Sequence, residues 1–79
     1  ENQLGVYVDN SANELVIKNY TNLDIKKLGL YNILGQSIKT WNKLGTDTEY
    51  RKEVQLPAAI YVVRITTENG EVVTKIRVE

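Results

Sequence analysis

The chain has 79 residues and contains neither cysteine nor histidine, which excludes disulfides, thiolate nucleophiles and Cys/His zinc sites. Ten Lys and Arg residues balance ten Asp and Glu residues. A chain without a basic excess is not expected to bind nucleic acid, and its lack of net charge allows self-association. No apolar run approaches the roughly 20 residues of a membrane helix, so no membrane insertion is expected. The length fits a single domain spanning residues 1–79.

The chain order predicts seven short β-strands. Its apolar residues are mainly Val, Ile, Leu and Tyr, which are typical of strands. Period-2 runs separated by turn-forming residues predict strands at 6–8, 15–18, 23–33, 37–41, 50–54, 60–67 and 72–78. The least patterned stretch, 42–48, is expected to be the main loop. Strands of this length and spacing indicate an all-β fold, a small immunoglobulin-like antiparallel β-sandwich.

Local patterns refine this expectation. Ile25 lies on the odd phase of the third strand whereas Leu28 and Leu30 lie on the even phase, so a bulge is predicted near Lys26 and Lys27. Gly35 and Gly70 each close a tight hairpin and should have positive φ. The sixth strand begins with apolar residues on both faces and is expected to be central and the most buried. The predicted core consists of Leu15, Ile17, Leu28, Leu30, Ile38, Val63, Ile65, Ile76 and Val78.

Candidate chemistry is sparse. Asp and Glu are the available acids and bases, and the pairs Glu49 with Glu53 or Asp47 with Glu49 are interpreted as solvated surface charge rather than a glycosidase pair. We therefore expect no enzymatic activity, no metal site and no cofactor. Asp9-x-Ser11-x-Asn13 begins like a calcium loop but lacks the required Gly and Glu, which favours a turn. Of the aromatic residues, Tyr20, Trp41 and Tyr50 lie near turns and remain open as a surface for sugars.

Three motifs follow one another in a distinctive order. Tyr31-Asn32-Ile33-Leu34-Gly35-Gln36 forms a hairpin, Leu56-Pro57-Ala58-Ala59-Ile60-Tyr61 forms a corner, and a final hairpin contains Gly70, Lys75 and Arg77. This order resembles the type A C-terminal sorting domain of the type IX secretion system, which exports proteins across the outer membrane of certain Gram-negative bacteria. The chain departs from that pattern in lacking the prolines of its opening motif and in having Ala59 at the usual Gly position. Export weaker than that of a typical domain is therefore expected.

The resemblance implies a function without chemistry. The domain would be the terminal part of a larger exported protein, recognised by the outer-membrane type IX translocon. A sortase-like protease would then remove it and attach the cargo to the cell surface, so the protein would be extracellular or surface-bound after transit through the periplasm. The final hairpin, 60–78, is the expected recognition surface, through pairing of its edge strand with a partner. The residues that the resemblance assigns to translocon recognition are Tyr31, Asn32, Gly35, Gln36, Leu56, Pro57, Tyr61, Gly70, Lys75 and Arg77.

Two other classes of function remain open. The domain could be an accessory β-sandwich that binds carbohydrate or mediates adhesion, or it could be a structural spacer of a secreted enzyme. A sorting signal must stand at the end of its protein, whereas an adhesion module can stand anywhere. Whether the natural chain ends at Glu79 would therefore discriminate between these readings best.

Overall fold

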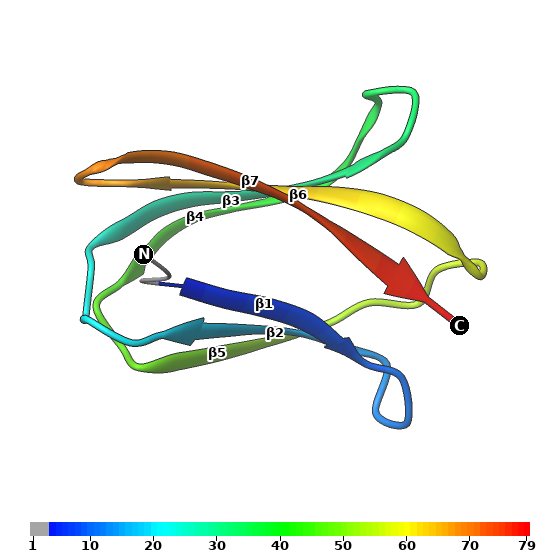
Figure 1. Ribbon diagram of the computed structural model, residues 1–79, viewed down its shortest axis with the longest axis horizontal. Helices are drawn as coiled ribbons and strands as arrows, with labels where there is room; N and C mark the ends of the chain where they lie inside the picture. Colours follow the sequence, from blue (N-terminus) through cyan, green and yellow to red (C-terminus); the bar gives the residue numbers. More distant parts are fainter. Residues whose placement is uncertain (1–3) are drawn as a thin grey trace.

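The computed structural model describes residues 4–79, which form seven strands in two packed sheets (Figure 1). The pleat of a strand points successive side chains to opposite faces, so the strands form mainly where apolar and polar residues alternate. The strands are β1 (Leu4–Asp9), β2 (Glu14–Asn19), β3 (Ile25–Asn32), β4 (Ser37–Gly45), β5 (Glu49–Glu53), β6 (Ala59–Thr67) and β7 (Gly70–Val78).

The two sheets have the orders β1-β2-β5 and β4-β3-β6-β7, and every neighbouring pair is antiparallel. The predicted antiparallel β-sandwich of seven strands is therefore confirmed. The chain changes sheet between β2 and β3, between β4 and β5, and again between β5 and β6. Residues 4–79 contain no helix that could cross a membrane.

The core lies between the sheets. Leu15 and Ile17 of β2 face Leu28, Leu30, Val63 and Ile65 of β3 and β6, and all of these are almost fully buried. Every residue of the predicted core is buried except Ile38, whose exposed fraction is 39%. The prediction for Ile38 is wrong because the register shifts at this point: Leu30 pairs with Lys39 and Tyr31 with Ser37. Ile38 is the extra residue of this irregularity and has no partner of its own.

The turn and bulge predictions are confirmed, but the predicted main loop is wrong. The register of β3 shifts between Ile25 and Lys27, and Gly35 and Gly70 have φ of 87° and 121°. Within the supposed loop 42–48, β4 continues to Gly45 and pairs with Ile25. Within this part of the strand Lys43 has a positive φ of 57°, which a non-glycine residue adopts at a cost and which the sequence pattern does not reveal.

The sixth predicted strand is internal but is not buried on both faces. β6 lies between β3 and β7; Tyr61, Val63 and Ile65 point into the core, whereas Ile60 is 38% exposed. A sandwich covers only the inner face of each sheet, so apolar residues on the outer face of β6 stay at the surface. Three consecutive residues of β2, Leu15 to Ile17, are buried instead.

Candidate functional site

The β3–β4 turn is closed by its own polar residues. The Asn32 N–H donates to Gln36 O at 3.1 Å, and the Gly35 N–H donates to Asn32 O at 3.0 Å. The Asn32 side chain accepts from the N–H groups of Leu34 and Gln36 at 2.9 and 3.0 Å and donates to Gln36 Oε1 at 2.7 Å. Asn side chains commonly bond the backbone of turns in this way. Asn32, Gly35 and Gln36 therefore shape the turn, and their hydrogen-bonding groups are largely used within it.

Tyr31 and Tyr61 also have structural roles. The ring of Tyr31 lies over Gly29, where a Cβ would approach ring atom Cε1 to 2.7 Å. Buried Tyr61 donates from Oη to Pro57 O at 2.7 Å. A tyrosine near the start of this strand that bonds the backbone a few residues upstream is the tyrosine corner of immunoglobulin-like sandwiches. The Leu-Pro-x-x-x-Tyr motif is thus a device that fixes the entry into β6.

The structure gathers the residues named by the resemblance at one end of the four-stranded sheet, with the exception of Gly70. Asn32 pairs with Tyr61, Tyr31 with Val62 and Val62 with Lys75, so the turn, the corner and the end of β7 adjoin. Arg77 lines a hollow of about 350 Å³ at this end, together with Ala58, Ala59, Ile60, Val78 and Glu79. Gly70 lies at the other end of β7, where Thr67 Oγ1 donates to its carbonyl at 3.1 Å. Gly70 is eight residues from Val78 along β7, which corresponds to about 26 Å in an extended strand.

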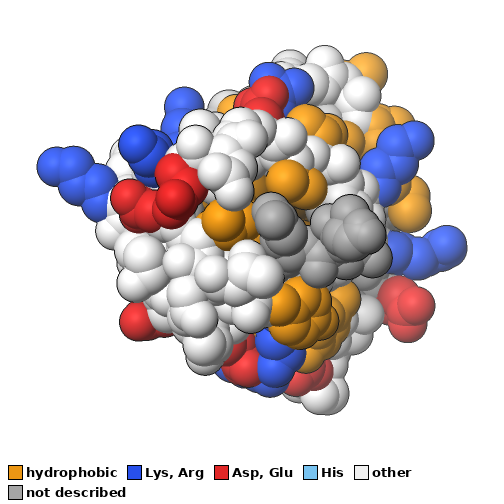
Figure 2. All heavy atoms as spheres, turned by 60° about the vertical axis from the view of Figure 1, so that its left-hand side comes forward, with side chains coloured by type: hydrophobic (Ala, Val, Ile, Leu, Met, Phe, Trp, Pro, Cys, Tyr) orange, Lys and Arg blue, Asp and Glu red, His pale blue; other side chains and the backbone are white. Residues whose placement is uncertain are grey.

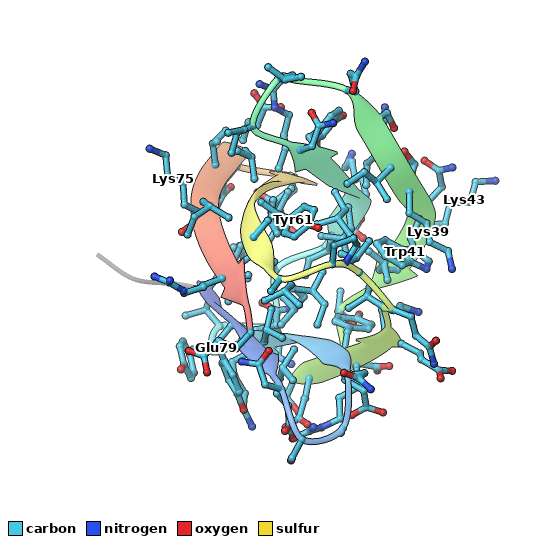
Figure 3. The ribbon with its side chains drawn as sticks, turned by 90° about the vertical axis from the view of Figure 1, so that its right-hand side faces the viewer. Lys39, Trp41, Lys43, Tyr61, Lys75 and Glu79 are labelled. Atoms are coloured by element: carbon cyan, nitrogen blue, oxygen red, sulfur yellow. The ribbon has the colours of Figure 1, made fainter. Side chains whose placement is uncertain are left out.

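The four-stranded sheet carries most of the positive charge. Its strands contain seven basic residues and one acidic residue, Glu71, an excess of six positive charges in a chain that is neutral overall. Figure 3 shows three of these side chains at the two edges of the sheet, with Lys39 and Lys43 projecting from the β4 side and Lys75 from the β7 side. The basic residues are Lys26, Lys27, Lys39, Lys43, Arg64, Lys75 and Arg77.

The three-stranded sheet differs because most of its charges pair with one another. Arg51 contacts Glu49 at 2.6 Å, Glu14 at 3.1 Å and Asp9 at 3.4 Å, and Lys18 forms a further ion pair with Glu49. Hydrogen bonds from Lys18 and Arg51 lower the pKa of Glu49, and a hydrogen bond from Ser11 is the main cause that lowers the pKa of Asp9. A general acid needs a raised pKa, so Glu49 is tuned in the opposite direction. Residues 4–79 contain no group of His, Cys, Asp and Glu suited to a metal ion.

The aromatic residues left open for sugar binding do not lie together. Tyr50 is buried, and its Oη accepts from the Asp47 N–H at 2.8 Å and donates to Leu44 O at 3.1 Å. Trp41 is half-buried against the core, with Lys39 Nζ 5.5 Å from the centre of its ring. Tyr20 is exposed, but its ring covers Gly5 of the three-stranded sheet. These three residues therefore form no shared platform.

The structure also brings forward residues that the motifs alone did not single out. Ile33 and Leu34, at the tip of the β3–β4 turn, are 70% and 80% exposed. Arg64 lies over the Tyr31 ring, 5.7 Å from its centre, and forms an ion pair with Glu71 at 3.4 Å. A hollow of about 280 Å³ beside the turn is lined by Tyr31, Asn32, Ile33, Gly35, Val62 and Arg64. Two apolar residues in the middle of a polar turn were the signal that could have identified this tip.

Comparison with known proteins assigns the chain to a family. A search of the curated proteins finds no match. A match to a protein family, in contrast, covers residues 1–77 and so includes all ten residues considered above. The chain belongs to the family described as Domain of unknown function (DUF8694).

Proposed function

We propose that this domain is a C-terminal sorting signal that directs an attached cargo protein across the outer membrane through the type IX secretion system. The observation that carries the proposal is the gathering of the motif residues, Gly70 apart, at one end of the four-stranded sheet. Motifs far apart in the sequence thereby adjoin in the fold, with buried Tyr61 supporting this end from within. A translocon that recognises a folded domain needs an ordered surface and no catalytic group.

The final hairpin supports the proposal through its position. Within residues 4–79, β7 is an edge strand that pairs with β6 alone, and edge strands present backbone groups to which a partner can add a strand. The C-terminal end of β7 is anchored, because the N–H of Glu79, the next residue, donates to Asn10 Oδ1 at 2.9 Å. Val72 and Val73, near the start of β7, are exposed apolar residues. The first half of β7, at the end of the sheet away from the β3–β4 turn, is thus a second surface suited to pairing with the translocon.

The proposal is tested by fusing residues 1–79 behind a periplasmic reporter in a host with the type IX machinery. The reporter should reach the cell surface or the medium, and a sortase-like protease should remove the domain. Deleting 71–79 should leave the reporter in the periplasm, because β6 then becomes a bare apolar edge. Glu53→Gln is the matched surface control and should export normally. An intact fusion that stays in the periplasm would refute the proposal, and glycan binding that depends on Trp41 would favour the adhesion alternative.

A further inference from the structure

The tip of the β3–β4 turn presents two neighbouring apolar side chains to solvent. Among residues 4–79, Ile33 and Leu34 are the most exposed large hydrophobic residues, at 70% and 80%. Figure 1 shows the turn projecting beyond the body of the sandwich. Isolated exposed hydrophobic residues are common and need no explanation. Two at the projecting tip of one turn are a different matter, because Gly, Asn, Asp and Ser usually occupy such positions.

The turn does not need these two side chains for its own stability. Its backbone is held by Asn32 and Gln36, and Gly35 supplies the positive φ of 87° that the turn requires. Ile33 and Leu34 therefore contribute little apolar burial in the isolated domain. The hydrogen bonds keep them in a fixed geometry, which lowers the entropy lost on binding to a partner of matching shape.

The surroundings of the tip define the chemistry of that partner. The hollow of about 280 Å³ beside Ile33 is partly lined by Arg64, and Lys75 occupies the same cross-strand row as Tyr31. Arg64 has one ion-pair partner in residues 4–79, the exposed Glu71. An apolar projection beside cationic side chains fits a partner surface that has an apolar pocket and acidic residues beside it.

We propose that Ile33 and Leu34 are the anchor with which this domain docks into an apolar, acid-rimmed pocket of a partner protein. The inference rests on the proposed function and deepens it, since the partner is the translocon protein that recognises the domain. A lipid bilayer is a poorer occupant. Two aliphatic side chains bury less hydrocarbon than one myristoyl chain, and a single myristoyl chain gives only marginal, reversible membrane binding.

The test compares three reporter fusions in a host with the type IX machinery: the wild type, Ile33→Ser with Leu34→Ser, and Tyr20→Ser. Tyr20 is a matched control because the residue is 63% exposed and its ring lies over Gly5 of the other sheet, away from the tip. The double variant should lower export at least about tenfold, the effect of removing a binding hot spot, whereas the control should export normally. Thermal unfolding of the purified domains should show that the double variant stays folded.

The outcomes separate the inference from the function on which it rests. Normal export of the folded double variant would overturn the anchor and leave the sorting function standing, whereas failure of the wild-type fusion to leave the periplasm would overturn both. Arg64→Glu should also reduce export, and Arg64→Lys should restore part of it. Two binding measurements complete the test. Wild-type binding to phosphatidylglycerol vesicles, or concentration-dependent dimerisation in sedimentation, would overturn a protein pocket as the occupant if the double variant abolished it.

Discussion

The two sheets of the sandwich share one core but have contrasting outer surfaces. The strands of the three-stranded sheet carry four acidic and three basic residues, and Arg51 and Lys18 are both neutralised within it. The strands of the four-stranded sheet carry seven basic residues and one acidic residue, Glu71. Among residues 4–79, the charges of these strands form one ion pair, between Arg64 and Glu71. In the described part of the chain, most charges of the first surface are paired, whereas the second leaves most of its basic side chains unpaired and exposes apolar side chains that a partner could cover.

The two ends of the molecule also differ in how their side chains are used. At the end that carries the turn and the corner, polar groups form the turn and apolar side chains project from it. On the face shown in Figure 2, which includes the opposite end, hydrophobic side chains occupy much of the middle, and basic and acidic side chains lie around the periphery. Mixed charges of this kind are ordinary for the surface of a soluble domain. The recognition surfaces that we propose therefore lie on the four-stranded sheet.

The shared core should respond equally from both sheets, and this is the largest effect that we expect. Truncating Ile17 of β2 or Ile65 of β6 to Ala should each lower the free energy of unfolding by about 2–5 kcal/mol, because both side chains are almost fully buried. Ile38→Ala should change it by less than about 0.5 kcal/mol, since Ile38 lies outside the core. Urea unfolding measures all three variants. A large loss for Ile38 with a small loss for Ile65 would invalidate the assigned core.

Replacing the two hairpin glycines of the four-stranded sheet should give the next largest loss of stability. Gly35 and Gly70 have positive φ, and a Cβ added at either would meet no atom within 4 Å. Replacement by Val should therefore act through the backbone conformation alone, at a cost of about 1–3 kcal/mol. Gly5→Ala offers a contrast, since its φ is not positive and the added Cβ would instead meet Tyr20 Oη at 2.8 Å. If both Val variants melt at the wild-type temperature, the turn assignments are wrong.

Each sheet also contains a tyrosine whose hydroxyl fixes a loop. The two hydroxyls should differ in how much they contribute to the free energy of unfolding. Tyr50 of the three-stranded sheet makes two hydrogen bonds in the β4–β5 connection, and Tyr61 of the four-stranded sheet makes one, to Pro57. At about 0.5–1.5 kcal/mol for each net hydrogen bond, Tyr50→Phe should destabilise the domain more than Tyr61→Phe. Urea unfolding of the two variants and their parent measures the difference. An equal or reversed order would show that water replaces the bonds of Tyr50.

Much of the fold follows from local sequence pattern. Period-2 alternation predicts the strands, Gly35 and Gly70 predict their turns, and the change of phase after Ile25 predicts the bulge. Each of these signals lies within a few residues of the feature that it determines. Periodicity and turn chemistry are therefore sufficient to predict them.

The remaining features depend on pairing between distant segments. The exposure of Ile38 arises from a register shift against β3, and β4 extends to Gly45 with Lys43 in a left-handed conformation. The cationic sheet is hidden in a chain of zero net charge, because its strands come from separate parts of the sequence. For the candidate site, the motifs identified the turn and the corner. The hydrogen bonds by which they close the fold, and the exposure of Leu34, are visible only in the three-dimensional structure.

The ion pairs of the three-stranded sheet should give the smallest effect, seen as a dependence of stability on pH. The pKa values of Asp9 and Glu49 are lowered in the folded protein from ordinary values of 3.8 and 4.5. The unfolded chain then binds more protons in acid, so stability is highest above these ordinary values and is lost as pH falls through the lower, folded values. All these groups are solvent-exposed, which limits the effect.

Thermal unfolding between about pH 7 and pH 2 measures this contribution. The wild-type melting temperature should fall on acidification below about pH 4, and high salt should reduce the fall by screening the pairs. Arg51→Gln should flatten the profile, because Arg51 is the shared partner of Asp9, Glu14 and Glu49. Lys52→Gln is the matched control; it removes one positive charge from the same strand, from a residue with no ion pair among residues 4–79. If the two variants gave the same profile, net charge and not the network would determine the acid response, and the contrast between the sheets would lose its electrostatic basis.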